Sequence, residues 1–459
     1  MSTLNSDPIV PPFWDLFKRI KNTDIAKSSF WNIYDPISTL SNNSSPLKFK
    51  INKPSYDQFI DWDECYIELF TEITGYKKDG KDPEDLAIHD AIKASPVNNI
   101  AHSLFKKIEI EANNTVIASV DNYAYVAYLN TLFNYDKASK SGFCRIQGWI
   151  DEAAGTTGTG GAAVDKMNNI DSTTVSTNAH KRKQQYMYSN GNLILKPFTS
   201  IFHLDTVMIP GVEFKISLER YANGSFYMMG QPTSTSQPFE IRIKEAKLHV
   251  HFIQVFPDYG NSINETRRFD HVPISYNVID QQIISADIAT GSFHYDVPDL
   301  FQGQHPCRIC AMIVPSAAFS GSLSLNPFRF EHANISEISL KKDSINFPCP
   351  PIYCNFSTRE CARAYYLLLR ALNSPHPACP DFQYNEFLNG FTLFNFDLSP
   401  DQAGGTEPHA ITNQNVTWSL NIKFRSGTPT ALTLLVYYEV DKLINIDPSN
   451  SISTEKAFF

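Results

Sequence analysis

Regular alternation of apolar and polar residues is the feature that most constrains the fold of this 459-residue chain. It is clearest in residues 47–51, 212–219 and 416–424, where apolar side chains occupy every second position. That spacing places them on one face of a β-strand. A strand with one apolar face is typical of antiparallel sheets that cover a core on one side. The pattern predicts an all-β protein in which Phe214 and Trp418 are buried and Lys215 and Thr417 face outward.

In one predicted strand, the alternation of apolar and polar residues changes phase. Ile241 and Ile243 occupy one parity, whereas the apolar residues from Ala246 onward occupy the other. A β-bulge adds one residue to a strand and restores a common inner face. We therefore expect a bulge near Lys244–Glu245.

Two segments have helical periodicity, and they predict an internal duplication. Apolar residues recur at helical spacing in Tyr125–Phe133 and in Cys361–Leu372, and no other long helix is expected. Each helix follows an alternating strand pair, 105–116 or 334–347, and precedes a loop and further strands. We infer two tandem antiparallel jelly-roll sandwiches, a double jelly roll, each with a short inserted helix. An immunoglobulin-like pair is disfavoured because neither half has the Cys–Trp–Cys spacing.

The predicted organisation has four parts. An N-terminal arm (residues 1–34) precedes a first jelly roll (35–257) and a second one (258–447), and a C-terminal tail (448–459) follows. The polar segment Pro257–Arg268 is interpreted as the linker between the rolls.

Charge and composition exclude several classes of protein. The formal net charge of −9 argues against wrapping bare nucleic acid, and no sequence-specific nucleic-acid partner is expected. No apolar run reaches the length of a transmembrane helix, and no secretory signal is recognised. Eight cysteines in 459 residues are too few for a disulfide scaffold and suggest a reducing, intracellular folding environment.

Two side-chain pairs consist of residue types that can bind metals. His249 and His251 share one strand face, but the same face carries Lys247, and the sequence around them offers no carboxylate or thiol as a further ligand. Cys307 and Cys310 form a CxxC without a well-spaced second pair, so buried free thiols are favoured. No metal, cofactor or catalytic residues are predicted, and the chain is not expected to be an enzyme.

Two further segments have simple interpretations. The Gly-rich stretch Gly155–Ala163 lacks the context of a phosphate-binding loop and is expected to be a mobile surface loop. The basic run Lys181–Lys183 is too short to specify a nucleic-acid site, and a solvated loop or strand end is favoured.

Several phrases, in order, resemble the major capsid proteins of Polinton/Maverick elements and adintoviruses. They consist of packing and turn residues, and their shared order over nearly the whole chain carries the resemblance. The matching segments are Tyr34–Ser38, Pro96–Ile110, Tyr123–Tyr135, Lys181–Arg182, Phe202–Arg220, Asn326–Leu340, Asn389–Gln402 and Tyr437–Asp447.

The resemblance implies a structural major capsid protein. Three chains would form a pseudo-hexagonal, hexon-like capsomer, and capsomers would tile an icosahedral shell around a double-stranded DNA genome. The partners would be the chain itself, the penton and other minor capsid proteins. The protein would reside in the virion after synthesis and assembly inside the host cell.

Two alternatives remain open on the residues alone. One is a carbohydrate-binding β-sandwich protein with aromatic side chains in a groove. The other is a glycosidase-like β enzyme, which requires two converging carboxylates that the sequence does not nominate.

Overall fold

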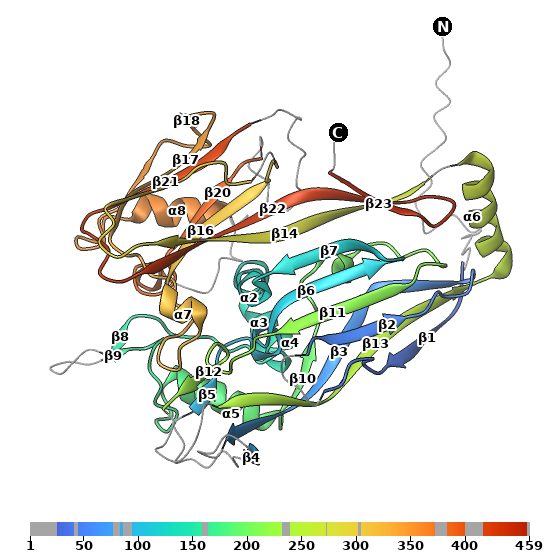
Figure 1. The fold of residues 1–459 in the computed structure, drawn as a ribbon, viewed down its shortest axis with the longest axis horizontal. Helices are drawn as coiled ribbons and strands as arrows, with labels where there is room; N and C mark the ends of the chain where they lie inside the picture. Colours follow the sequence, from blue (N-terminus) through green and yellow to red (C-terminus); the bar gives the residue numbers. More distant parts are fainter. Residues whose placement is uncertain are drawn as a thin grey trace, which may run out of the picture.

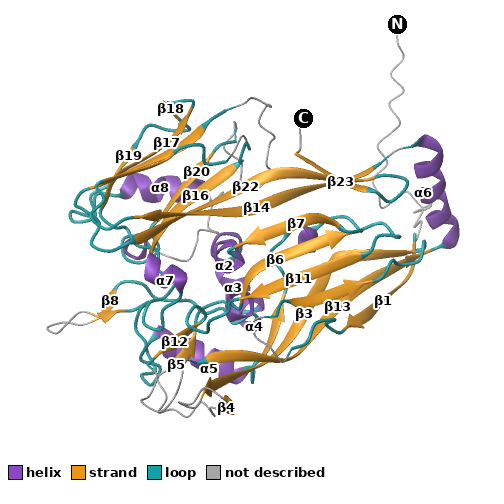
Figure 2. Cartoon of the chain, viewed as in Figure 1, coloured by secondary structure: helices purple, strands orange, loops and turns teal. Residues whose placement is uncertain are grey.

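The computed structural model of the chain describes residues 25–40, 45–76, 83–85, 94–157, 164–231, 239–271, 273–301, 304–371, 383–399 and 416–456. The chain forms two β-sandwiches that lie against each other (Figure 1). In Figure 2 the strands make up the two sandwiches, and several of the helices and most of the long loops gather at their ends and at their junction. No helix in the described ranges is long and apolar enough to cross a membrane.

The first roll consists of two facing antiparallel sheets. One sheet contains, in spatial order, β1 (Ala26–Tyr34), β13 (Glu240–Val255), β3 (Gln58–Tyr76) and β10 (Asn192–Leu195), and β4 (Pro83–Asp85) pairs with β3. The other contains β2 (Leu47–Ile51), β11 (Phe214–Arg220), β6 (Phe105–Ala112) and β7 (Thr115–Asp121). Short ribbons are formed by β5 (Ala94–Pro96) with β12 (Met228–Gly230) and by β8 (Thr156–Thr157) with β9 (Val164–Asp165).

The second roll repeats this strand order. Its first sheet contains β14 (Ile274–Ile288), β22 (Leu432–Ile446), β16 (Arg308–Pro315) and β20 (Leu393–Asp397), and β23 (Ile452–Lys456) pairs with β22. Its second sheet contains β15 (His294–Val297), β21 (Trp418–Phe424), β17 (Ile335–Lys342) and β18 (Ile345–Asn346), and β19 (Ile352–Tyr353) pairs with β17. Strand for strand along the chain, β1-β13-β3-β10 corresponds to β14-β22-β16-β20, and β2-β11-β6-β7 corresponds to β15-β21-β17-β18.

Helices occupy the connections. They are α1 (Ile100–Ser103), α2 (Tyr123–Asn134), α3 (Lys137–Ser141), α4 (Phe143–Ile146), α5 (Asn178–Tyr188), the 3-10 helix η2 (Ser200–His203), α6 (Pro257–Asp270), α7 (Ser316–Ser320), α8 (Ala362–Ala371) and α9 (Tyr384–Phe387). The two helices predicted from periodicity are α2 and α8, and each lies at the same place in the strand order of its roll.

The predicted fold class is confirmed. Corresponding strands β11 and β21 have the same burial pattern, with alternate side chains buried from Phe214 and from Trp418 onward. The predicted bulge is also present, because the pairing of β13 with β3 shifts register between Ile243 and Glu245. Both rolls contribute to one continuous apolar core.

The expectation that no other long helix exists is wrong. The segment Pro257–Arg268, interpreted as a polar linker, forms most of α6, and α5 is a further helix. Pro257 stands at the start of α6, where its fixed φ and missing N–H are tolerated. Asp258 in the first turn and Arg267 in the last complement the helix dipole. Such a polar helix lacks the apolar stripe by which the others were recognised.

Both ends of the chain extend the sheets beyond the predicted rolls. Residues 26–34, assigned to the N-terminal arm, form β1 and pair with β13. Residues 452–456, assigned to the tail, form β23 and pair with β22. The first 24 residues of the predicted arm lie outside the described part of the chain. The other predicted boundaries stay predictions.

Candidate assembly surfaces

Helix α2 fills the junction between the rolls. Its side chains from Tyr123 to Phe133 are all buried, which is unusual for a helix of a sandwich protein and means that it is covered on every side. Tyr128 stacks on Phe328 of the second roll with 4.2 Å between ring centroids, and Tyr125 meets the same ring edge-on at 5.5 Å. Aromatic pairs at these separations add stability beyond the area they bury. The two rolls therefore share an aromatic core.

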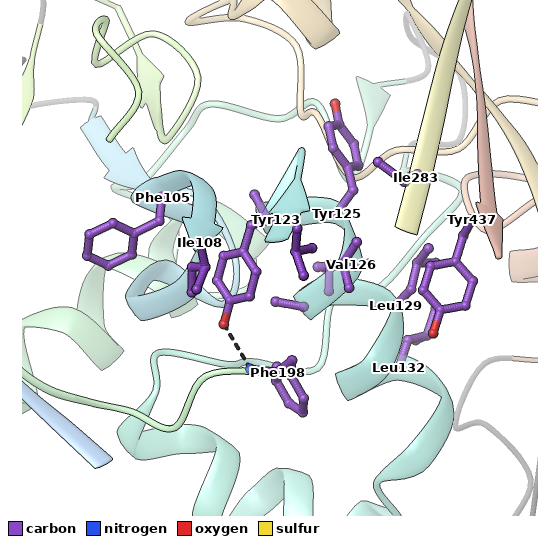
Figure 3. Packing of buried hydrophobic residues seen from close by; sticks show 14 of the residues in the cluster. Phe105, Ile108, Tyr123, Tyr125, Val126, Leu129, Leu132, Phe198, Ile283 and Tyr437 are labelled. Carbon is purple, nitrogen blue, oxygen red and sulfur yellow. Dashed lines mark hydrogen bonds between the residues drawn. The ribbon is translucent and has the colours of Figure 1, made fainter. Parts of the chain in front are cut away.

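One face of the sheet β14-β22-β16 lies against α2. Figure 3 draws Tyr437 of β22 beside Leu129 and Leu132 of α2, and Ile283 of β14 towards Tyr125. Alternate residues of a strand point to opposite faces, so the intervening residues of β22 face the second roll's own core. This two-sided cover explains why β22 is buried continuously from Leu432 to Asp441.

A buried ion pair lies on the same face. The Arg308 guanidinium donates to both carboxylate oxygens of Glu439, at 3.0 and 2.6 Å, and lies 6.0 Å from the ring centroid of Phe133 in α2. Burial lowers the pKa of Arg308, but the Glu439 carboxylate together with the nearby Tyr437 and Cys310 outweighs burial and raises it above its usual range. Buried charges of this kind persist only when they are paired.

Polar contacts fix the alignment of the rolls around this core. Asn130 of α2 and Gln281 of β14 exchange side-chain hydrogen bonds of 2.9 and 3.0 Å. Gln282 donates to the carbonyl of Ser119 in β7 at 2.6 Å. The second roll thus rests on α2 and β7 of the first. We call this contact, formed by the sheet β14-β22-β16 on α2 and β7, the junction.

In the described part of the chain, the equivalent face of the first roll keeps exposed apolar side chains. We call it the open face and define it by Trp31 and Ile33 of β1, His249 and His251 of β13, and Tyr66 of β3. Trp31 is 46% exposed and Ile33 is 58% exposed. The rings form a row, with centroid separations of 4.8 Å from Trp31 to His251, 5.8 Å from Trp31 to Tyr66 and 4.7 Å from Tyr66 to His249. An exposed row of aromatic side chains is a frequent mark of an interaction site.

Carboxylates from β3 adjoin both histidines. The Nε2 atom of His249 lies 3.3 Å from Glu68, and the Nδ1 atom of His251 lies 3.2 Å from Asp61. The sequence-based view that no carboxylate stands near these histidines is therefore wrong. The partners were missed because they are 181 and 190 residues away in the chain. Within the described ranges no group of three metal-ligating side chains occurs, and each histidine has its own carboxylate.

The cysteine pair belongs to the second roll. Cys307 and Cys310 are both buried and unpaired. The Cys307 thiol lies 3.5 Å from Asp441, whereas Cys310 is the strand partner of Tyr437. Burial raises the pKa of Cys307 to about 12, which disfavours the thiolate that metals bind. The prediction that this pair holds no metal stays a prediction.

The sequence predicted a solvated basic run, but only Lys181 is exposed, whereas Arg182 and Lys183 are buried. Lys181–Lys183 lies within α5, and Arg182 is buried, where it forms an ion pair with the buried carboxylate of Glu152. A charged residue inside a helix can be recognised as buried only when its partner is known, and Glu152 lies in a distant loop. Arg182 therefore has a structural role.

The Gly-rich loop is described only at its stem. Strands β8 and β9 form a short ribbon, and residues 158–163 lie outside the described part. The stem touches the second roll, because the Gly155 N–H donates to the Asn389 carbonyl at 3.1 Å. Asp165 also pairs with Arg329 at 2.6 Å. The role of the loop itself stays open.

Comparison of the sequence with known proteins finds a distant relative. The chain is 24% identical over 365 residues to an uncharacterized protein of Caenorhabditis elegans, covering 78% of this chain and 81% of that protein. No protein-family profile matches it.

Solved viral structures are similar over nearly the whole chain. A chain of the Sputnik virophage, solved by cryo-electron microscopy, has a TM-score of 0.64 at 11% identity, over 99% of this chain and 93% of that one. The Faustovirus major capsid protein has a TM-score of 0.56 at 10% identity, over 93% and 92% of the chains. The mavirus major capsid protein has a TM-score of 0.53 at 12% identity, over 100% and 97%. This likeness shows that the chain has the double jelly-roll fold of these proteins.

Proposed function

We propose that the protein is a structural major capsid protein, whose trimers tile an icosahedral shell around a double-stranded DNA genome in the virion. The observation that carries this is the open face: the sheet that the second roll buries at the junction has an uncovered counterpart on the first roll. The fold likeness to viral capsid proteins supports the same function. The sequence phrases point to the Polinton/Maverick and adintovirus type.

A second copy of the chain is the partner that fits the open face. At the junction, α2 and β7 cover the sheet of the second roll. The corresponding elements of the second roll are α8 and β18, and the described elements that pack most closely on them, β17, β19, β20 and α9, all belong to the second roll. Together with β19 they carry three exposed apolar side chains, Ile345, Tyr353 and Tyr366, which we call the apolar rim. Placing the rim of one chain on the open face of the next would repeat the junction between chains.

Charge favours the same pairing. The open face is flanked by Asp61 and Glu68, whereas α8 presents Arg363 and Arg370 to solvent. Opposite charges on two apolar patches increase the association rate and fix their register. The contact is head-to-tail, since two different surfaces meet, and such contacts build a closed ring when the rotation from one chain to the next closes. Three chains would give a ring of six similar rolls.

Native mass spectrometry at micromolar concentration tests this function. The wild-type protein should have a dominant mass near three chains. Ile33→Asp should yield monomers, because it places a charge in an apolar interface. Val175→Asp is the matched control, since Val175 is an exposed apolar residue elsewhere on the first roll, and it should stay trimeric. A wild-type monomer that persists on concentration would contradict the proposal.

A mixing experiment tests the head-to-tail contact. Tyr366→Asp places a charge in the apolar rim and leaves the open face intact. Ile33→Asp places a charge in the open face and leaves the apolar rim intact. Each variant alone should be monomeric, whereas the mixture should form dimers with one chain of each kind. Equal behaviour of the mixture and the separate variants would exclude this pairing. Electron microscopy of concentrated wild-type protein then tests for shells.

The N-terminal segment would also take part in assembly. We propose that the first 24 residues act outside the rolls, on neighbouring subunits or an internal component under the shell. Penton and minor capsid proteins would be further partners, and synthesis and assembly would occur in the host cell. Deleting residues 1–24 should leave the trimer intact and impair shell formation. Loss of the trimer would instead make this segment part of the subunit fold.

A carbohydrate-binding function is the second candidate. Trp31 and Tyr66 lie on a sheet face beside Asp61 and Glu68, and aromatic rings with adjacent carboxylates suit sugar rings and their hydroxyls. A glycan array separates the two candidates. Glycan binding by a persistent monomer that is lost in Trp31→Ala would favour this alternative.

A further inference from the structure

A tight hairpin connects β19 to α8 in the second roll. Asn355 and Glu360 form an antiparallel bridge in which each N–H donates to the other's carbonyl, at 3.2 and 2.9 Å. They are therefore a hydrogen-bonded pair. The next pair along the hairpin, Cys354 and Cys361, occupies the non-hydrogen-bonded position.

That position brings two side chains together. In a non-hydrogen-bonded antiparallel pair the Cα atoms are about 4.5 Å apart and the side chains lie on the same side. Disulfides span Cα separations of about 4.4–6.8 Å, so this pair can be bridged without moving the backbone far. Both thiols are buried and unpaired. A hydrogen bond between them lowers the pKa of Cys361, which makes Cys361 the better nucleophile of the two.

The surrounding backbone holds the pair in place. The Cys354 N–H donates to the Ser336 carbonyl at 3.0 Å, and the Cys361 N–H donates to the Tyr384 hydroxyl at 3.0 Å. The same hydroxyl donates to the Arg359 carbonyl at the hairpin tip, at 2.6 Å. Both strands of the hairpin are therefore anchored.

We propose that Cys354 and Cys361 are a disulfide-forming pair that closes when the protein meets a small peroxide oxidant. The Cys361 thiolate attacks one peroxide oxygen, the O–O bond breaks, and a sulfenic acid and water form. The Cys354 thiol loses its proton and attacks the sulfenic sulfur, so that the S–S bond forms and a second water leaves. Two thiols and one peroxide give one disulfide and two waters, and a small oxidant suits thiols this buried.

The bridge would link the residue after β19 covalently to the residue before α8. Since α8 carries Tyr366, oxidation fixes the base of the helix that presents this side chain. The pairing does not depend on the assembly of the protein, so its test is independent of the proposed capsid function.

Peptide mapping of the full-length protein tests the pair. The protein is treated with hydrogen peroxide, unfolded with an alkylating reagent and digested with trypsin. Cleavage after Lys342, Arg359 and Arg363 places Cys354 in residues 343–359 and Cys361 in residues 360–363. We expect these two peptides to be linked, with a mass lower than their sum by two hydrogen atoms, and to separate on reduction.

Variants identify the cysteine involved, because Cys349 lies in the same peptide as Cys354. Cys349→Ser should keep the link and Cys354→Ser should abolish it. In Cys354→Ser, Cys361 should accumulate as a sulfenic acid that a dione reagent traps. The peptide map of the wild-type protein does not depend on whether any variant folds. Two unlinked peptides after complete oxidation, or a link that Cys349→Ser removes, would overturn the proposal.

Discussion

The two rolls have the same strand order but different surroundings. In the second roll, the face of β22 that carries Tyr437 and Glu439 is buried against α2. In the first roll, the corresponding face of β13 carries His249 and His251, which are partly exposed beside the exposed Trp31 and Ile33 of β1. The helices differ in the same way, since α2 is buried on all sides whereas α8 exposes Arg363, Tyr366 and Arg370. One design can therefore act as a core element in one copy and as a contact surface in the other.

The largest effect is expected at the buried ion pair of the junction. Arg308→Ala leaves the Glu439 carboxylate buried and unpaired and should lower the free energy of unfolding by about 3–5 kcal/mol. Asp61→Ala, which removes a partly exposed carboxylate from the open face, should change it by about 0–1 kcal/mol. Urea unfolding in the monomeric Ile33→Asp background measures both without a contribution from association.

A paired replacement sharpens this test. Changing Arg308 to Met together with Glu439 to Leu removes both charges and should cost much less than Arg308→Ala alone. Equal losses from the single and the paired replacements would mean that packing, and not the unpaired charge, dominates at the junction.

Corresponding strands should contribute about equally to the free energy of unfolding in the two rolls. Phe214 of β11 and Trp418 of β21 are buried at 0% and 1% exposure, so replacing either with Ala should cost about 3–5 kcal/mol. Lys215→Ala and Thr417→Ala, on the outward face, should stay within about 0.5 kcal/mol. Similar losses on both faces in denaturant unfolding would show that the strand faces are wrongly assigned.

Corresponding helices should differ in how much they contribute to the stability of the monomer. Tyr128→Ala in α2 removes the ring stacked on Phe328 and should cost about 3–5 kcal/mol, the range for large aromatic core residues. Tyr366→Ala in α8 removes a side chain that is 59% exposed and should change the stability of the monomer by less than about 0.5 kcal/mol. Thermal unfolding of both variants in the monomeric background compares them. A large loss for Tyr366→Ala would place α8 in the core of the subunit.

A pH dependence of stability is expected from His102 in the first roll. His102 is fully buried, between the Tyr123 hydroxyl at 2.7 Å and the Gln147 side chain. Burial lowers its pKa from 6.5 to about 4, partly offset by the Gln147 hydrogen bond. Between these values only the unfolded chain binds the proton. The contribution of His102 is therefore complete above pH 6.5 and is lost as the pH falls towards 4, by up to about 3 kcal/mol.

Urea unfolding at several pH values measures this loss. His102→Gln should reduce the slope of the profile between pH 4 and 6.5, and part of the slope should remain because burial also lowers the pKa of His203 to about 4. His332→Gln in the second roll is the control, because His332 is less buried and its pKa is lowered less. An unchanged profile for His102→Gln would mean that His102 has the same pKa in the folded and the unfolded chain.

Elements with a local pattern were predictable. Strands β11 and β21 followed from alternation, and α2 and α8 followed from helical periodicity. Helices α5 and α6 were missed because they are polar, so they show no apolar stripe. The mostly apolar run Leu432–Val440, interrupted by Thr433 and Glu439, was a signal of burial on both faces and a local sign of the junction.

The sequence by itself determined which residues of each strand face a core, because alternation within a strand is set by the backbone geometry of neighbouring residues. Tertiary structure decided which outer faces are covered. Whether His251 meets solvent, or Tyr437 meets α2, depends on contacts between segments more than a hundred residues apart. Those contacts leave no regular spacing in the sequence, and they alone separate the junction from the open face.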